Sequence, residues 1–414
     1  MNTWSLSWRG LRVVTGLEVR QRIRSRRWLV ALAAWFVFVG AITTLVIGSA
    51  MEGFTRRADT DSSGISSPGP LAFGLNVLFV LGMGLVIAPT FTATSINGDR
   101  TAGTLATLQA TRLSALEIAA GKLLAAWLTS AVFLVVSLPF IVWTMVLGSI
   151  SIWQVLVCLA VVFVLVAVVC AIGLGWSSLL SRSAGSAVMT YLCIVALGII
   201  SPMVMALSVP FLTSQDTVKV WGLPQSVADS YYAQLDEYWK ANPDGDGSGA
   251  PAPPLGECTW TEQVEEQTHF ERTWWLLVPN PFVVVADAAP LPALGRESLN
   301  TYISHTGDPL AGIRVLVRQA ATPPATERDD CIYLYGNLGY NIEWEVGGTP
   351  RVTTPDGTPV TVQSPVQRQS IEVGPPVWPW GLGVNLLIGA AFFWVAVRRL
   401  AIPYGSLPRG VRVA

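Results

Sequence analysis

The sequence predicts a mainly α-helical membrane protein: six transmembrane helices, an N-terminal interfacial helix and a small α/β extracytoplasmic domain between spans five and six. Its 414 residues are 51% hydrophobic and only 13% charged, about half the charged fraction of a typical soluble domain. Six apolar runs are each long enough to cross a bilayer, which takes about 20 residues. Basic residues gather in segments that six spans would place on one side of the membrane.

The six apolar runs carry no acidic or basic residue in their central parts. A charge at the centre of a bilayer costs at least a few kcal/mol, so uncharged runs of this length favour membrane spans over soluble core helices. The expected spans are 28–48, 71–92, 118–146, 153–180, 186–212 and 377–397.

Residues 1–27 contain seven arginines and a single acid, and we expect them to form a helix on the cytoplasmic surface of the membrane. A cleaved signal peptide ending near residues 48–50 is an alternative interpretation. The basic segment and the apolar run are both longer than a signal peptide usually has, which favours a retained span. Four apolar residues fall near one face of the expected helix: Trp4, Trp8, Leu11 and Val14.

The segments between the spans differ strongly in charge. Those that share a side with the N-terminal segment hold 15 basic residues and three acids, whereas the other side holds 11 basic residues and 24 acids. Basic loops stay in the cytoplasm, so we expect both termini inside and the protein in the plasma membrane. The expected organisation is a cytoplasmic helix (1–27), spans one to five (28–212) with a coupling loop (93–117), an extracytoplasmic domain (213–376), span six (377–397) and a cytoplasmic tail (398–414).

The expected outer domain, residues 213–376, is acidic and rich in proline. Helical spacing of apolar residues predicts a helix over 227–242. Residues 274–285 are apolar but too short to span, so we expect them to be buried or to dip into the outer leaflet. Alternating polarity predicts strands over 312–319, 332–340, 341–346, 360–363 and 369–373.

Cys258 and Cys331 are the two cysteines of this outer segment, whereas the other three lie within expected spans. An even pair in an oxidising compartment predicts a disulfide.

The sequence lacks the motifs of the commonest enzyme sites. It contains no G-x-x-x-x-G-K-[ST] phosphate loop, no H-E-x-x-H and no G-x-S-x-G. Only two histidines occur, His269 and His305, and the Asp-Gly-Asp-Gly run at 244–247 lacks the glutamate that a calcium loop needs. His305 and Asp308 could serve a hydrolase, but polar pairs on loops are usually solvated. We expect no catalytic residue, no metal site and no bound cofactor on this chain, and no nucleic-acid partner.

The loop between spans two and three has the strongest local pattern. Asn97 and Gly98 tolerate left-handed geometry and are expected to end a helix. Residues 100–110 are expected to form a short helix, with Leu105 and Leu108 available for packing. Ser114-x-x-Glu117 matches a capping box, which predicts the start of the next long helix.

This loop resembles that of the permease subunits of ATP-binding-cassette (ABC) exporters of the type-2 permease family. The motifs that carry the resemblance are Asp99-Arg100, Gly103-Thr104-Leu105, Thr111…Ser114, Glu117-Ile118 and Gly121-Lys122. The chain departs from the family at Thr101 and Ala106, where glutamate is frequent, and at Arg112, where proline is frequent. The basic N-terminal helix, the six spans and the presence of an outer segment between spans five and six also match the family's organisation, whereas the resemblance does not cover the outer domain itself.

The resemblance implies a permease that is not itself an enzyme, with ATP and Mg²⁺ bound by a separate ABC ATPase subunit present in two copies. A second permease copy or a paralogue would complete the assembly in the lipid membrane. The residues expected to couple to the ATPase are Asp99, Arg100, Gly103, Thr104, Leu105, Leu108 and Glu117.

The family's cargo pathway is lined by spans two and five. Here these spans offer Asn76, Thr90, Met203 and Met205 among apolar residues. We therefore expect export of a hydrophobic or amphipathic molecule. The alternatives are a membrane-anchored sensor or scaffold with a ligand-binding outer domain and no transport activity, and a membrane-embedded enzyme.

Overall fold

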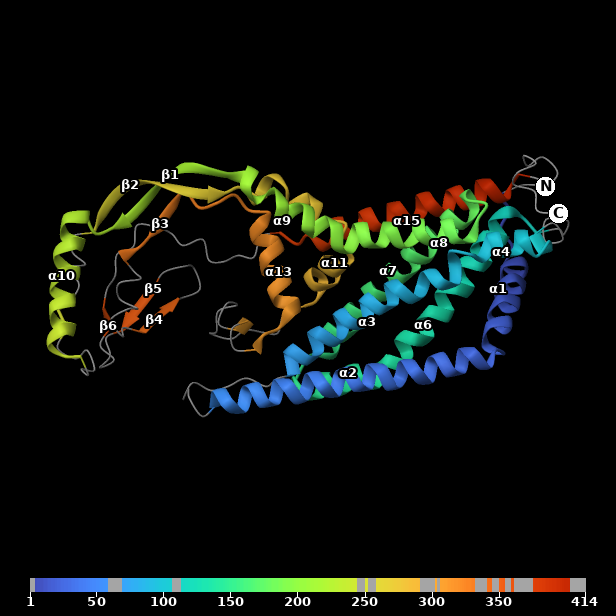
Figure 1. Ribbon diagram of the computed structural model, residues 1–414, viewed down its shortest axis with the longest axis horizontal. Helices are drawn as coiled ribbons and strands as arrows, with labels where there is room; N and C mark the ends of the chain where they lie inside the picture. Colours follow the sequence, from blue (N-terminus) through green and yellow to red (C-terminus); the bar gives the residue numbers. More distant parts are fainter. Residues whose placement is uncertain are drawn as a thin grey trace. The chain divides into compact units, whose positions relative to one another are not determined.

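The computed structural model describes residues 4–58, 69–105, 113–243, 250–251, 258–290, 302–303, 306–331, 341–344, 350–353, 359–360 and 375–402. The chain forms two compact units (Figure 1). The helical unit comprises Met1–Ala206, Trp274–Arg318 and Pro375–Ala414, and the sheet unit comprises Leu207–Thr273 and Gln319–Gly374. The expected outer segment 213–376 is therefore divided between the two units.

Within the described ranges, six helical segments are long and apolar enough to cross a membrane, which confirms the six expected spans. Most boundaries differ from the expected ones by no more than three residues, but the first span, expected to end at residue 48, continues as a helix for ten further residues to Ala58. The spans are α2 (Arg26–Ala58), α3 (Gly69–Thr92), α6 (Ala115–Leu147), α7 (Ile152–Leu179), the run of α8 (Ser183–Val195), a π-helical turn (Ala196–Ile200) and α9 (Ser201–Leu212), and α15 (Trp378–Leu400).

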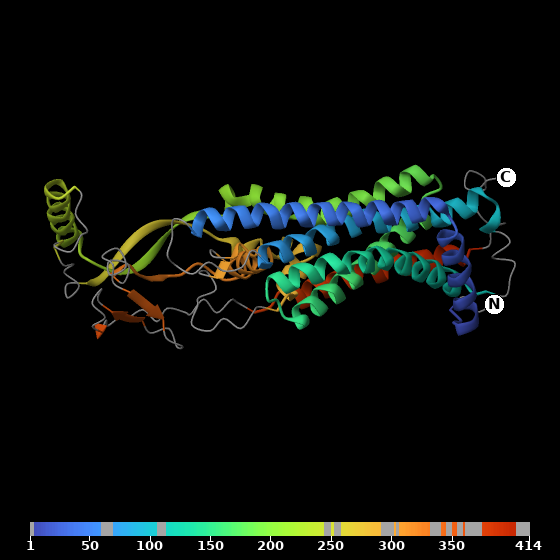
Figure 2. The same cartoon turned by 90° about the horizontal axis from the view of Figure 1, so that it is seen from below.

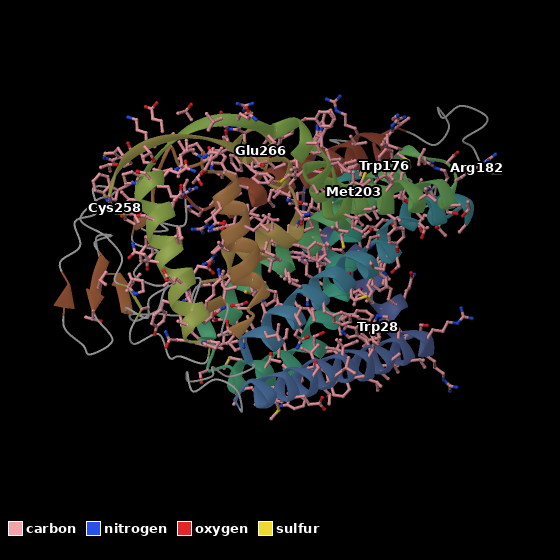
Figure 3. All side chains as sticks on the ribbon, turned by 60° about the vertical axis from the view of Figure 1, so that its left-hand side comes forward. Trp28, Trp176, Arg182, Met203, Cys258 and Glu266 are labelled. Atoms are coloured by element: carbon pink, nitrogen blue, oxygen red, sulfur yellow. A yellow bond between two sulfur atoms is a disulfide. The ribbon has the colours of Figure 1, made fainter. Side chains whose placement is uncertain are left out.

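Helix α7 forms the centre of the helical unit and packs against α3, α6 and α15. Glycines let α15 approach closely, since a Cβ at Gly175 would lie 2.6 Å from the Phe392 ring. The neighbouring Trp176, labelled in Figure 3, contacts the same ring at a centroid distance of 5.5 Å. The core of the unit is built from fully buried apolar side chains of α3 and α7, including Phe73, Leu81 and Leu165.

Span five is interrupted where Pro202 follows the π-helical turn. Proline has no backbone N–H, so the carbonyl of Gly198, four residues earlier, loses its helical donor. The side-chain amide of Asn280 donates to that carbonyl at 3.0 Å. Its oxygen accepts from the backbone N–H groups of Phe282 and Val283 and so caps α11 (Pro281–Ala288). Asn280 thereby fastens α11 to the break in span five.

Residues 274–285 are largely buried. This agrees with the first of the two alternatives expected for them, burial in the protein rather than insertion into the outer leaflet. They form a 3₁₀ turn (Trp274–Leu276) and most of α11, which packs against α15 and α7. The carboxylate of Asp287 on α11 accepts from the backbone N–H groups of Val377 and Trp378, each at 2.7 Å, and so caps α15. Arg318 donates to the same carboxylate at 2.6 Å.

The strand expected over residues 312–319 is wrong, because this segment lies in helix α13 (Pro309–Ala320). The start of this segment has two helix signals that outweigh the alternating polarity of its residues. Asp308 accepts the Leu310 backbone N–H at 2.9 Å, and Pro309 occupies the first helical position, where its missing donor costs nothing.

The sheet unit contains a three-stranded sheet in the order β2–β1–β3. Strands β1 (Thr213–Gly222) and β2 (Thr259–Thr268) pair antiparallel, and β3 (Glu327–Asp329) pairs parallel to β1. Between β1 and β2 lies α10 (Gln225–Ala241), which confirms the helix expected over 227–242. A second, antiparallel sheet has the order β4–β5–β6, with bounds Asn341–Trp344, Pro350–Thr353 and Pro359–Val360.

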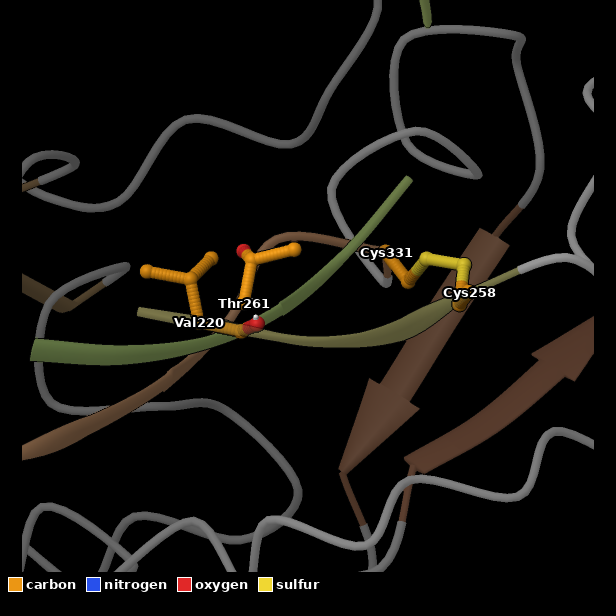
Figure 4. Close-up of a disulfide and its surroundings, with 4 residues drawn as sticks. All are labelled: Val220, Cys258, Thr261 and Cys331. Atoms are coloured by element: carbon orange, nitrogen blue, oxygen red, sulfur yellow. Dashed lines mark hydrogen bonds between the residues drawn. A yellow bond between two sulfur atoms is a disulfide. The ribbon is translucent and has the colours of Figure 1, made fainter. Parts of the chain in front are cut away.

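Strand β4 lies within the strand expected over 341–346, whereas β6 shares only Val360 with the strand expected over 360–363. Residues 332–340, 345–346, 361–363 and 369–373 lie outside the described residues. Cys258 and Cys331 form the expected disulfide, with Cα atoms 6.5 Å apart, beside the β1–β2 ladder (Figure 4). It joins the start of β2 to the chain that follows β3, 73 residues along the sequence.

Replacing both Cys258 and Cys331 by serine should destabilise the sheet unit by about 4 kcal/mol, because the loop that the disulfide closes is long. Thermal unfolding of the purified protein, followed with and without reductant, measures this loss. Cys193→Ser, which leaves the disulfide intact, serves as the control. Alkylation of Cys258 or Cys331 without prior reduction would contradict the pairing.

Candidate functional site: the junction of α1, α4 and α6

Two short helices meet the long helices at one end of the helical unit (Figures 1 and 2). Helix α1 (Trp8–Ile23) packs across the beginning of α6, and α4 (Ser95–Thr101) follows span two after a turn at residues 93–94. Leu11 and Val14 of α1 are buried, and a Cβ at Gly121 of α6 would lie 2.5 Å from Val14. We call this meeting point of α1, α4 and α6 the inner junction, after the cytoplasmic side on which the sequence predicts it to lie.

The apolar face expected on the N-terminal helix is divided in the structure. Leu11 and Val14 are buried, with Val14 against Gly121 of α6, whereas Trp8 is 84% exposed and Trp4 is also exposed. The face that the helical wheel predicts is therefore shared between protein contacts and a free surface. Contact of α1 with lipid remains a prediction.

The carboxylate of Glu117 caps two helices at once. Its Oε1 accepts the backbone N–H of Ser7, the N-cap of α1, at 2.7 Å, and its Oε2 accepts the backbone N–H of Ser114, the N-cap of α6, at 2.9 Å. The Ser114 hydroxyl accepts the Glu117 N–H at 3.0 Å, which confirms the expected capping box. The negative charge lies at the positive ends of both helix dipoles, where it is stabilising.

A glycine makes room for this double cap. A Cβ at Gly10 would lie 2.7 Å from the Glu117 carboxyl carbon, a distance that carbon atoms do not tolerate. Gly16, two turns along α1, has no atom within 4 Å of the equivalent position. Gly10 is thus needed for packing, and Gly16 is not.

A buried lysine joins the three helices. The Lys122 side chain on α6 is only 2% exposed, and its Nζ lies 2.6 Å from Glu18 Oε1 on α1 and 2.5 Å from Asp99 Oδ2 on α4. Arg22 pairs with the same Glu18 at 3.5 Å, so the four charges balance. Breaking a buried ion pair by removing one partner typically costs 3–5 kcal/mol, since the remaining charge is stranded.

Helix α4 is also fixed from span four. The hydroxyl of Ser177 on α7 accepts the backbone N–H groups of Ile96 and Asn97 at 3.0 and 3.2 Å, which caps α4 from a distant segment. The helix end expected at Asn97-Gly98 is therefore wrong. The helix of span two ends at Thr92 instead, before the turn at 93–94. Asn97 and Gly98 lie inside α4, because Ser177 satisfies the free amides at the start of that helix.

The family motif after α4 forms a turn. Gly103 has a φ of +71°, in the left-handed region that favours glycine. The Thr104 hydroxyl donates to the backbone and side-chain oxygens of Asp99, each at 3.3 Å. Leu105 is 2% exposed and packs in a core cluster with Ile118 of α6 and Leu400 of α15.

Six of the seven expected coupling residues lie at or next to this junction: Asp99, Arg100, Gly103, Thr104, Leu105 and Glu117. Leu108, like residues 106–110 as a whole, lies outside the described residues. Over 100–105 the helix expected for 100–110 is interrupted, because α4 ends at Thr101 and a turn occupies residues 102–103. Sequence reasoning missed the contact partners Glu18, Lys122 and Ser177. A lone glutamate among seven arginines, and a lysine at the start of an apolar run, are the signals that point to a buried pair.

The four expected pathway residues do not converge among the described residues. Asn76 and Met205 are buried, whereas Met203 on α9 is 56% exposed (Figure 3). Thr90 lines an apolar groove beside α2. A pathway through a single protomer therefore finds no support in their positions.

Six membrane-length helices among the described residues, with short helices joined to them at one end, define a multi-pass membrane protein. Comparison with protein families matches residues 12–219, half of the chain, to the model described as ABC-2 family transporter protein. The chain belongs to this family, whose permeases associate with an ABC ATPase subunit and are not themselves catalytic. A comparison with curated proteins found no match.

A second polar cluster lies in the sheet unit around His269. Its Nδ1 lies 2.7 Å from Glu271 Oε1, and its Nε2 lies 2.7 Å from Asp216 Oδ2 and 2.9 Å from the Ser214 hydroxyl. The His269 side chain is 12% exposed. The hydrogen bond with Glu271, followed by that with Asp216, raises the pKa of His269 above its ordinary value. The two carboxylates favour the protonated form of the ring, and its contacts with Ser214 and Asp216 join the residue after β2 to β1.

Replacing Gly10 by alanine should destabilise the helical unit by about 1–3 kcal/mol, because the added methyl overpacks against Glu117. Gly16→Ala, the matched control, should stabilise α1 by about 0.5–1 kcal/mol through helix propensity alone. Melting temperature and tryptic cleavage at the arginines of α1 report the two effects. Equal melting temperatures and equal cleavage rates for the two variants would show that the double cap does not form.

His269→Gln should make the stability of the sheet unit less dependent on pH. Because the folded-state pKa is raised, protonation of His269 stabilises the fold fully below its unfolded value of about 6.5, and this contribution is lost as pH rises through the folded-state pKa. The variant should therefore melt lower than wild type in acid and approach it in alkali. His305→Gln controls for loss of a histidine elsewhere, and a constant difference at all pH values would exclude the charged ring.

Proposed function

We propose that the chain is the transmembrane permease of an ABC exporter, which moves a hydrophobic or amphipathic molecule with energy from a separate ATPase subunit. The observation that supports this proposal most directly is the inner junction. Helix α1 is joined there to the distant α4 and α6 by Lys122 and Glu117. A rigid joint at the base of the spans is what transmission of a push requires.

In this proposal the ATPase contacts the family motif next to α4 together with α1. Displacement of α4 would pull on Lys122 through Asp99, and through Glu18 it would carry α1 along. Both pairs are short and one partner is fully buried, so the helices move together or the pairs break at large cost. The spans would then switch as rigid bodies between inward-facing and outward-facing states.

The expected topology places the inner junction and both termini in the cytoplasm. The charge distribution supports this, since seven arginines lie in residues 1–27 and two more end α15. The disulfide between Cys258 and Cys331 fits the opposite, oxidising side. The full assembly would contain two permeases, identical or paralogous, and two ATPase copies that bind ATP and Mg²⁺.

One observation favours the alternative of a sensor or scaffold. The sheet unit is compact in its own right and is held by a disulfide and by an Arg328 guanidinium between Glu265 and Asp330. Such a unit could bind a ligand without any transport. The alternative predicts no ATPase partner and no vectorial movement of cargo.

Gly103→Val should uncouple ATP hydrolysis from transport, because a β-branched residue is strongly disfavoured at a positive φ and would displace the turn that follows α4. Gly98→Ala is the matched control, since its substituent meets no atom within 4 Å and its φ is not positive. Transport per ATP hydrolysed, measured in proteoliposomes with the co-purified ATPase, should fall several-fold only for Gly103→Val.

Membrane insertion should be the same for both variants. If no nucleotide-binding subunit co-purifies with the tagged permease and no vanadate-sensitive ATPase activity is found, the exporter proposal fails and the result favours the sensor alternative. Unchanged transport by Gly103→Val would remove the coupling role of this turn alone.

A further inference from the structure

An apolar groove of about 1210 Å³ opens along the first half of α2, within the helical unit. Its walls come from α2 and from the end of α3, including Ala34 and Phe38 on one side and Ile87 and Phe91 on the other, with Phe133 of α6 also in contact. Trp35 fixes α2 to α6 at this point, because its indole N–H donates to the Phe133 carbonyl at 2.9 Å. The groove is therefore built on a docked helix.

One end of the groove is basic and polar. Arg22, Ser25 and Arg27 line it there, next to Trp28 in the first turn of α2 (Figure 3). Arg22 donates through one terminal nitrogen, Nη2, to the Phe91 carbonyl at 3.2 Å and pairs weakly with Glu18. Burial lowers the pKa of Arg22 below its ordinary value.

Two buried donors at this end have no acceptor among the described residues: Nη1 of Arg22 and the indole Nε1 of Trp28. Buried donors without a partner are costly and rare in folded proteins. Both lie beside the additional positive charge of the exposed Arg27. An anionic oxygen would satisfy both donors, and beyond this end the groove is lined by apolar side chains apart from Thr90.

The length of the groove matches one leaflet. Its lining on α2 runs from Arg27 to Ala41, which is about 20 Å at the rise of an α-helix. The hydrocarbon of one leaflet is about 15 Å deep. A chain with an anionic head at Arg22 and an extended apolar tail along α2 fits these dimensions. A helix of a second permease would cover the walls but would bring no anion to the arginines.

We propose that this groove binds an acidic phospholipid of the cytoplasmic leaflet, with its phosphate at Arg22, Arg27 and Trp28 and an acyl chain between α2 and α3. The leaflet assignment rests on the topology of the proposed function, whereas the ligand class rests on the groove itself. Thr90, expected on the cargo pathway, would then face a lipid tail. The lipid would brace α1 against span one beside the inner junction.

The test uses the full chain in nanodiscs that contain phosphatidylglycerol and phosphatidylcholine, with retained lipid measured by native mass spectrometry. Wild type should retain phosphatidylglycerol preferentially. Arg27→Gln should lower this preference about fivefold, the usual contribution of one arginine near an anionic lipid. Arg26→Gln is the matched control, because Arg26 is exposed and does not line the groove.

A second pair of variants tests the tail. Ala34→Trp fills the groove and should abolish retention, whereas Leu29→Trp adds the same bulk on an exposed position outside it. Equal retention of both lipids by wild type, equal effects of Arg27→Gln and Arg26→Gln, or cross-linking of residue 34 to a second permease copy would overturn the proposal. Lipid selectivity without transport would count against the exporter proposal alone, and transport without lipid selectivity against the groove proposal alone.

Discussion

The arrangement of the short helices depends on a single ammonium group enclosed between two carboxylates. Lys122 has almost no contact with solvent, and it is held by Glu18 from a segment more than 100 residues earlier in the chain and by Asp99 from the preceding loop. A charge in this position is stable only while both partners remain. The pairs therefore fix where α1 and α4 lie, and the Glu117 double cap fixes how α1 begins.

The long helices were predictable because the bilayer leaves few choices. Within hydrocarbon, backbone polar groups must find partners inside the protein, and a helix satisfies nearly all of them within one segment, so a long uncharged run is expected to be helical. This constraint does not apply to the polar segments. There the strand expected over 312–319 is a helix, since the Asp308-Pro309 pair at its start decides the local conformation more strongly than alternation does.

The site was predictable in its motif but not in its contacts. The sequence marks Glu117 through its spacing from Ser114, which local geometry explains. The sequence contains no comparable sign that the other carboxylate oxygen of Glu117 would accept the Ser7 backbone N–H, or that Ser177 of span four would cap α4. These are contacts between distant segments, set by how the helices pack, and a single sequence carries no direct record of them. The same holds for Asn97-Gly98, whose turn propensity is overridden by the Ser177 hydroxyl.

The fastening of α11 to span five requires one particular side chain. The carbonyl of Gly198 needs a donor, whereas the first amides of α11 need an acceptor, and Asn280 supplies both from one planar amide. Aspartate is an equally good helix cap in general, yet here it would turn an oxygen toward another oxygen. A residue that looks interchangeable on the surface of a soluble helix is thus chemically unique at this break.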